Sequence, residues 1–143
     1  MPRPFLHVPE KISRRRGVAV PSPAMTILRD GTLADLASIS ELALRSKAHW
    51  GYDRAFVEAC RAELTFTAER LVRERVRVAA SERSIHGVAS LSFDGPDAEL
   101  TALFVAPSEM GRGIGQRLFA DALVAARQRG VRRLIIEADP NAV

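Results

Sequence analysis

The chain has 143 residues, 47% of them hydrophobic and 27% charged, which suits one globular domain with a core of its own. Its single cysteine, Cys60, excludes an intrachain disulfide and favours a reducing compartment, and three scattered histidines give no metal-ligand spacing. No apolar run has the length of a membrane span, so a cytoplasmic protein that needs no metal is expected.

The formal net charge of +4 belongs to the start of the chain. Residues 1–24 hold five basic residues, one acidic residue and five prolines, and the remainder is neutral. This composition predicts a flexible basic arm rich in proline and arginine, followed by a domain over residues 25–143. A solvated tail, or a natural start at Met25, is favoured over a nucleic-acid-binding arm or a targeting segment. The arginine run has no aromatic residues interleaved with it, and a secretory apolar stretch is missing.

The first half of the domain is predicted as a short strand followed by helices. Residues 25–29 form the strand candidate, and Thr32 with Asp35 three residues later makes a helix start that resembles a capping box. Apolar residues at helical spacing continue this helix to about Lys47. A second helix begins near Asp53, and residues 67–73 add a further helical turn.

Three strands, a helix and a final strand are predicted in the second half. Residues 75–78 alternate between basic and apolar, residues 85–93 form a longer strand, and a turn over 94–97 leads into a strand over 98–105. A helix over about 113–129 ends at Gly130, and residues 134–136 form a buried strand. A strand reached through a helix should lie parallel to its predecessor, which predicts an α/β fold with a mixed (α+β) sheet.

Three glycines in five residues, Gly111, Gly113 and Gly115, lie between the strand over 98–105 and the helix that follows it. Glycine lets the backbone approach a ligand closely, and free amides at a helix N-terminus favour a phosphate. Arg112 adds a positive charge. A P-loop is excluded because Gln116 and Arg117 stand where lysine and serine or threonine are required, and the spacing also fails the dinucleotide fingerprint.

The segment Met110-Gly111-Arg112-Gly113-Ile114-Gly115 resembles the signature of the GNAT N-acetyltransferases, Arg/Gln-x-x-Gly-x-Gly/Ala. The preceding Leu-Phe-Val-x-Pro stretch and the order of elements are also similar to that family. Met110 departs from the pattern, which should weaken the site without abolishing it. The resemblance implies that acetyl-CoA is the co-substrate, and that the following residues contact it: Leu103, Phe104, Val105, Met110, Gly111, Arg112, Gly113, Ile114, Gly115, Gln116 and Asn141.

Glu99 is the candidate general base, because some family members carry their base glutamate at this spacing before the signature. Transfer to an amine needs a neutral amine, and a carboxylate is suited to remove its proton. The alternative is a surface glutamate at the start of a strand. The segment 49–53 contains His49, Trp50 and Tyr52, which would either bind the acceptor through cation–π contacts or close the core at a helix junction.

In the family, a helix and two more strands follow the second parallel strand. That helix commonly supplies a tyrosine that acts as the general acid and protonates the departing thiolate. Here seven residues follow Ile136, so the domain is expected to be incomplete at its C-terminus and turnover to be impaired. The strand over 134–136 would then form a sheet edge that favours a homodimer. The function predicted is acetyl transfer to a small-molecule or peptide amine. The alternative is a non-catalytic acetyl-CoA-binding pseudoenzyme, and nucleic acid is a disfavoured partner.

Overall fold

The computed structural model describes residues 26–82 and 84–136. The predicted arm over 1–24 and the predicted cofactor contact of Asn141 therefore lie outside the described residues. The elements follow in the predicted order, with these bounds: β1 (Ile27–Asp30), α1 (Leu36–His49), α2 (Arg54–Ala59), α3 (Arg61–Leu64), α4 (Ala68–Arg73), β2 (Arg75–Ala80), β3 (Ile85–Asp94), β4 (Asp97–Val105), α5 (Ile114–Gln128) and β5 (Arg133–Ile136). Short 3₁₀ turns, η1 (Leu33–Asp35) and η2 (Pro107–Glu109), precede α1 and follow β4.

Local capping explains where the helices begin. Thr32 and Asp35 form the predicted capping box, in which the Thr32 amide donates to the Asp35 carboxylate (2.8 Å), although the first turn is 3₁₀. Asp53 caps α2 by accepting a hydrogen bond from the Phe56 amide (2.7 Å). The second predicted helix is divided at Cys60 into α2 and α3.

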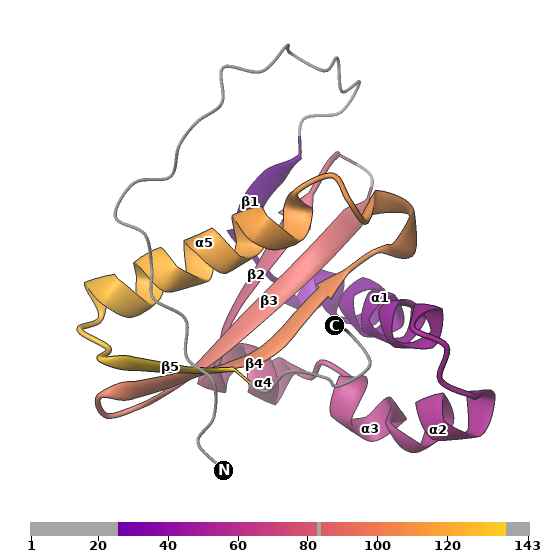
Figure 1. Cartoon of the computed structure of the whole chain (residues 1–143), viewed down its shortest axis with the longest axis horizontal. Helices are drawn as coiled ribbons and strands as arrows, with labels where there is room; N and C mark the ends of the chain where they lie inside the picture. Colours follow the sequence, from indigo (N-terminus) through magenta and orange to yellow (C-terminus); the bar gives the residue numbers. More distant parts are fainter. Residues whose placement is uncertain (1–25, 83, 137–143) are drawn as a thin grey trace.

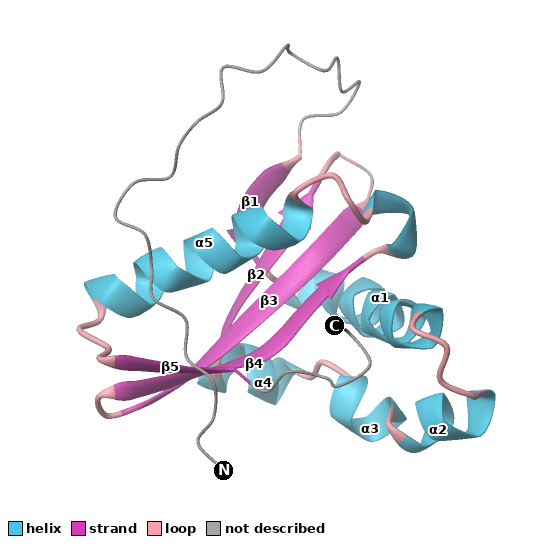
Figure 2. Cartoon of the chain, viewed as in Figure 1, coloured by secondary structure: helices cyan, strands magenta, loops and turns pink. Residues whose placement is uncertain are grey.

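The strands form one sheet in the order β1-β2-β3-β4-β5. The first four strands are antiparallel to their neighbours, and β5 lies parallel to β4 after the crossover through α5. The predicted mixed sheet is confirmed. Figures 1 and 2 show α5 crossing one face of the sheet, with α1 and α4 on the opposite face and α2 and α3 to the side of α1. Within the described residues, no helix has the length and apolar character needed to cross a membrane.

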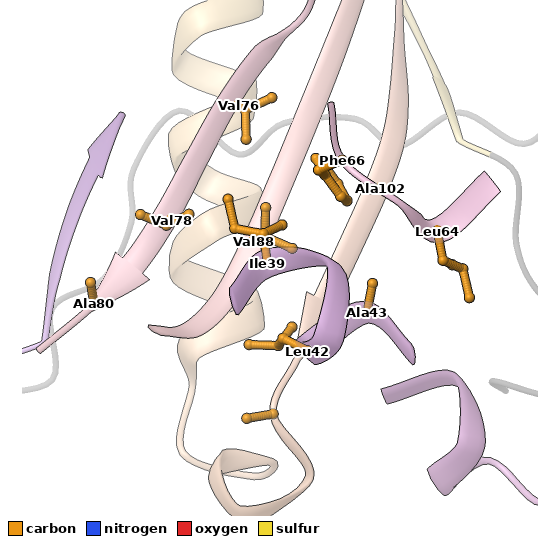
Figure 3. Packing of buried hydrophobic residues seen from close by; sticks show 11 residues of the cluster. Ile39, Leu42, Ala43, Leu64, Phe66, Val76, Val78, Ala80, Val88 and Ala102 are labelled. Carbon is orange, nitrogen blue, oxygen red and sulfur yellow. The ribbon is translucent and has the colours of Figure 1, made fainter. Parts of the chain in front are cut away.

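The core consists of two layers, one on each face of the sheet. Ile39 and Leu42 of α1 are fully buried and point toward Val78 and Val88 of the sheet (Figure 3). On the other face, Leu118 of α5 is fully buried against residues of β2 and β3. Burial of each such side chain contributes roughly 1.5–3 kcal/mol. The helix α5 that carries the glycine segment at its start is thus held rigidly on the sheet.

Candidate active site

The glycine segment leads from β4 into α5 with a backbone that only glycine adopts readily. Gly111 and Gly113 have φ angles of 83° and 82°, in the left-handed region. Gly113 is the N-cap residue of α5. A Cβ atom at either position would meet no atom within 4 Å, so the left-handed backbone, and not a lack of space, explains these two glycines.

The first turn of α5 presents free amides. The first hydrogen bond into the helix runs from the Arg117 amide to the Gly113 carbonyl (3.0 Å). Helix geometry therefore leaves the amides of Ile114, Gly115 and Gln116 without an intrahelical acceptor. The dipole of this 15-residue helix adds partial positive charge at the same place, so the turn can bind an anion.

We call residues 110–116 the cradle. Two contacts place the cradle close to the sheet. A Cβ atom on Gly115 would lie 3.4 Å from the Val105 side chain, so the helix begins close to the end of β4. The Met110 amide donates to the Pro107 carbonyl (3.4 Å), which continues the 3₁₀ turn into the cradle. Arg112 is part of the cradle, and its side chain is 71% exposed.

Two residues beside the cradle were missed by the sequence analysis. One Glu109 carboxylate oxygen lies 3.8 Å from Arg112 Nη1, and the other lies 3.8 Å from His86 Nδ1. The His86 ring also contacts Ser81 Oγ at 2.9 Å. The ion pair between Glu109 and Arg112 could have been predicted from the sequence, because the two residues are three positions apart. The contact between His86 and Glu109 could not, because only the tertiary fold brings them together.

Strand β4 contains one residue more than β3 along their shared ladder. Ser90 pairs with Ala102 and Leu91 pairs with Leu100, so Thr101 is the extra residue of a β-bulge. Side chains alternate between the faces of a strand, and an extra residue reverses that alternation. Accordingly, Leu100 packs on the α5 face, whereas Ala102, two residues later, packs in the cluster under α1.

The direction of the amides at the end of β4 follows from one hydrogen bond. The Ala106 amide donates to the His86 carbonyl at the start of β3 (2.8 Å). Successive amides of a strand point to opposite sides, so the amide of Phe104 also points toward β3. The amides of Leu103 and Val105 point away from β3, toward the side on which β5 lies.

The ladder between β4 and β5 reaches Leu100 and Ile136, and the bulge begins at the next residue of β4. Glu99 lies within this ladder, between Ile135 on β5 and Ser92 on β3, and it is half-buried. Glu99 and Thr101 share a face, as expected, because their contacts on β3, Ser92 and Ser90, are two residues apart. The structure thus places the candidate base beside the bulge.

The junction between α1 and α2 carries the aromatic residues that the sequence singled out. Tyr52 stacks on Phe56 with ring centroids 4.7 Å apart, and the Lys47 ammonium lies 4.6 Å from the Tyr52 centroid. Trp50 is 44% exposed and does not close the core, whereas Tyr52 is half-buried. The aromatic pair does bind a cation, but that cation belongs to the chain itself.

A polar cavity of about 440 Å³ lies between α1 and the turn that joins β2 to β3. Arg29 and Asp35 line it and form a bidentate ion pair (2.7 and 3.0 Å). The Arg29 hydrogen bonds lower the pKa of Asp35 to about 2, helped by the Thr32 amide and hydroxyl and opposed by burial. None of the residues lining the cavity belongs to the cradle, so it is separate from the candidate active site.

A mixed sheet with a glycine cradle at the start of the helix after β4 is the arrangement that the sequence predicted for an acetyltransferase. The model of the acetyltransferase (GNAT) family matches residues 36–143. The chain belongs to that family, and the resemblance deduced from the cradle is confirmed.

Solved structures agree with this assignment. The PaiA N-acetyltransferase from Thermoplasma acidophilum, in complex with coenzyme A, is 19% identical with a TM-score of 0.73 over 81% of this chain and 80% of its own. A GCN5-related N-acetyltransferase from Rhodopseudomonas palustris is 27% identical with a TM-score of 0.68, covering 88% and 79%. A GNAT acetyltransferase from Brucella melitensis, in complex with acetyl-CoA, is 22% identical with a TM-score of 0.62, covering 80% and 77%. No curated protein sequence matches the chain.

Proposed function

We propose that this acetyltransferase binds acetyl-CoA through the cradle and the end of β4 and transfers the acetyl group to an amine of a small molecule or peptide. The observation that carries the proposal is a set of backbone amides that have no acceptor among residues 26–82 and 84–136. They run from Leu103 and Val105 on β4 to Ile114, Gly115 and Gln116 at the start of α5. A ligand with an amide-bearing arm and a pyrophosphate has groups that match both sets of donors.

The cradle fits a pyrophosphate. Left-handed Gly111 and Gly113 turn the chain so that the first amides of α5 are free, and Arg112 supplies an exposed positive charge. Met110 is part of the cradle, but its thioether has no charge and no hydrogen-bond donor to offer to a phosphate. We therefore expect the backbone to provide most of the binding.

On β4, the proposal assigns different roles to the three residues that the resemblance named. The amides of Leu103 and Val105 are free to bind the arm of the co-substrate, since they point away from β3. The Phe104 amide points toward β3, and its side chain packs against the core cluster under α1. Phe104 thus supports the strand and does not offer its amide.

Acetyl-CoA supplies a thioester whose carbonyl carbon accepts the amine. We assign to Glu99 the removal of a proton from the ammonium form of the acceptor, directly or through a water molecule. The neutral amine then forms the C–N bond while the C–S bond breaks, and the thiolate takes up a proton. The free Leu103 amide, four residues along β4, is the donor proposed for the oxyanion.

Binding without turnover is the alternative, and one observation favours it. Tyr52, the only tyrosine of the sequence, stacks on Phe56 at the α1–α2 junction and has the Lys47 ammonium over its ring. The one tyrosine that could protonate the departing thiolate is therefore already engaged in other contacts. A homodimer through β5, the last strand of the described sheet, also stays a prediction.

Titration calorimetry with acetyl-CoA, paired with a thiol-release assay over a panel of amines and peptide N-termini, tests the proposal. Binding with amine-dependent release supports acetyl transfer. Binding without release for every acceptor supports the alternative, and the absence of binding would contradict both. Peptide N-termini are included among the acceptors because of one structural relative, the ribosomal-protein-S18-alanine N-acetyltransferase from Escherichia coli. It is 16% identical with a TM-score of 0.62.

A further inference from the structure

Four polar side chains from three separate segments close a ring around the β4 bulge. Arg70 of α4 donates through Nε to Glu74 Oε2 (2.8 Å) and through Nη2 to Ser90 Oγ on β3 (3.3 Å). Ser90 Oγ lies 2.6 Å from Thr101 Oγ1, and the Thr101 hydroxyl donates to Glu74 Oε1. The extra residue of β4 is therefore the member that completes the ring.

The protons in this ring have one consistent arrangement. The Thr101 hydroxyl donates to the carboxylate, so its oxygen accepts from the Ser90 hydroxyl. The Ser90 oxygen in turn accepts a hydrogen bond from Arg70, because a guanidinium group can only donate. The bonds thus run from Arg70 to Glu74 by two routes, one direct and one through Ser90 and Thr101, and the bonds to charged groups are the strong ones.

Three members of the ring are shielded from water, whereas Thr101 is exposed. Ser90 is fully buried, and the side chains of Arg70 and Glu74 are 13% and 11% exposed. The Arg70 guanidinium also lies 3.9 Å from the centroid of the Phe66 ring. An ion pair so shielded keeps its geometry better than an exposed pair.

We propose that Arg70, Glu74 and Ser90 are positioning residues that hold the bulge at Thr101 and thereby set the direction of the catalytic part of β4. This inference rests on the proposed function. The bulge separates Glu99, which lies on the same face as Thr101, from Leu103, whose amide points away from β3. Without the extra residue, the alternation of β4 would not reverse, and the Leu103 amide would be directed into the ladder with β3.

The test compares T101V with T101S. Valine keeps the shape of threonine but removes the hydroxyl, whereas serine keeps the hydroxyl. E74Q is the second variant, and E58Q is its matched control, because Glu58 forms a bidentate pair with Arg61 (2.6 and 2.9 Å) but is 54% exposed. Amide hydrogen exchange of a peptide over 97–106 is measured with a peptide over 75–80 as internal reference, together with acetyl-CoA affinity and steady-state kinetics.

T101V and E74Q should raise exchange in residues 97–106 about tenfold, weaken acetyl-CoA binding about tenfold, and raise KM for acetyl-CoA more than they lower kcat. T101S and E58Q should match the wild type. If T101V also matches the wild type, if T101S fails to rescue, or if residues 75–80 change equally, the inference is wrong. Should T101V not fold, S90A at the buried partner replaces it. If the wild-type chain does not bind acetyl-CoA, the proposed function is wrong, and the exchange measurements alone decide this inference.

Discussion

Arg77 on β2 and Asp121 on α5 form an ion pair that ties the helix of the cradle to the sheet. Arg77 Nε lies 3.2 Å from Asp121 Oδ2, and Arg75 Nη1 lies 3.1 Å from the same oxygen. All three side chains are at most 29% exposed. One carboxylate thus pairs with two guanidinium groups in a partly shielded site.

D121N should destabilise the fold, because it removes the carboxylate that Arg75 and Arg77 share and leaves Arg77 with only the exposed Asp30 at 3.1 Å. The expected loss is about 1–3 kcal/mol in the free energy of unfolding, measured by urea denaturation. R133Q is the control, since Arg133 pairs with Asp97 at 2.8 Å but is 62% exposed, and its stability should be unchanged. Equal stability of D121N and the wild type would show that the pair does not hold α5.

G113A should lower both stability and co-substrate affinity. Alanine in the left-handed conformation costs about 1–2 kcal/mol, and relief of that strain rotates the peptides that carry the free amides. We expect acetyl-CoA binding to weaken about tenfold in calorimetry. The matched control is G130A, because Gly130 has a φ of 78° and a Cβ there also meets nothing within 4 Å, but it lies at the far end of α5. G130A should lose similar stability and keep its affinity; equal affinity loss in both variants would contradict the cradle assignment.

E99Q should lower kcat about 100-fold and leave the affinity for acetyl-CoA unchanged, because the amide cannot accept the proton of the acceptor. The rate should also become less dependent on pH over the range in which the wild-type rate rises. E58Q again serves as the exposed control. A wild-type kcat in E99Q would mean that another group, or water alone, removes the proton.

Asp35 should make stability depend on pH at the acidic end. Its pKa is about 2 in the folded chain, mainly because of Arg29, against about 3.9 in an unfolded chain. The stabilisation is therefore present above the unfolded pKa and is lost as the pH falls through about 4 toward 2. Since Arg29 is 37% exposed, the contribution is discounted to the order of 1 kcal/mol.

Accordingly, D35N should be less stable than the wild type at pH 7 by that amount, and the difference should shrink between pH 4 and pH 2 in urea denaturation. D30N is the control, because Asp30 is 82% exposed although it lies 3.1 Å from Arg77. A difference between D35N and the wild type that is constant over this pH range would exclude the proposed linkage.

The sequence determined the order of the elements and the presence of the cradle, because both depend on neighbours in the chain. Helical and strand periodicity, the cap at Asp53 and the glycines at 111 and 113 act within one or two turns of backbone. The same local reasoning identified the family, which the match over residues 36–143 confirms. The same reasoning predicted one helix where the structure has α2 and α3, because no glycine or proline marks the break at Cys60.

Only the tertiary structure determined where β4 bulges and in which direction its amides point. The bulge at Thr101 is invisible in an alternating sequence, since it depends on how many residues β3 places opposite it. The carboxylate that holds it, Glu74, is 27 residues away, and Asp121 is 44 residues from Arg77. Such pairs form because packing brings distant segments together and excludes water from them, and no local pattern specifies that proximity. The sequence therefore predicted a cradle for acetyl-CoA, whereas the fold determined which amides of β4 point away from β3 beside it.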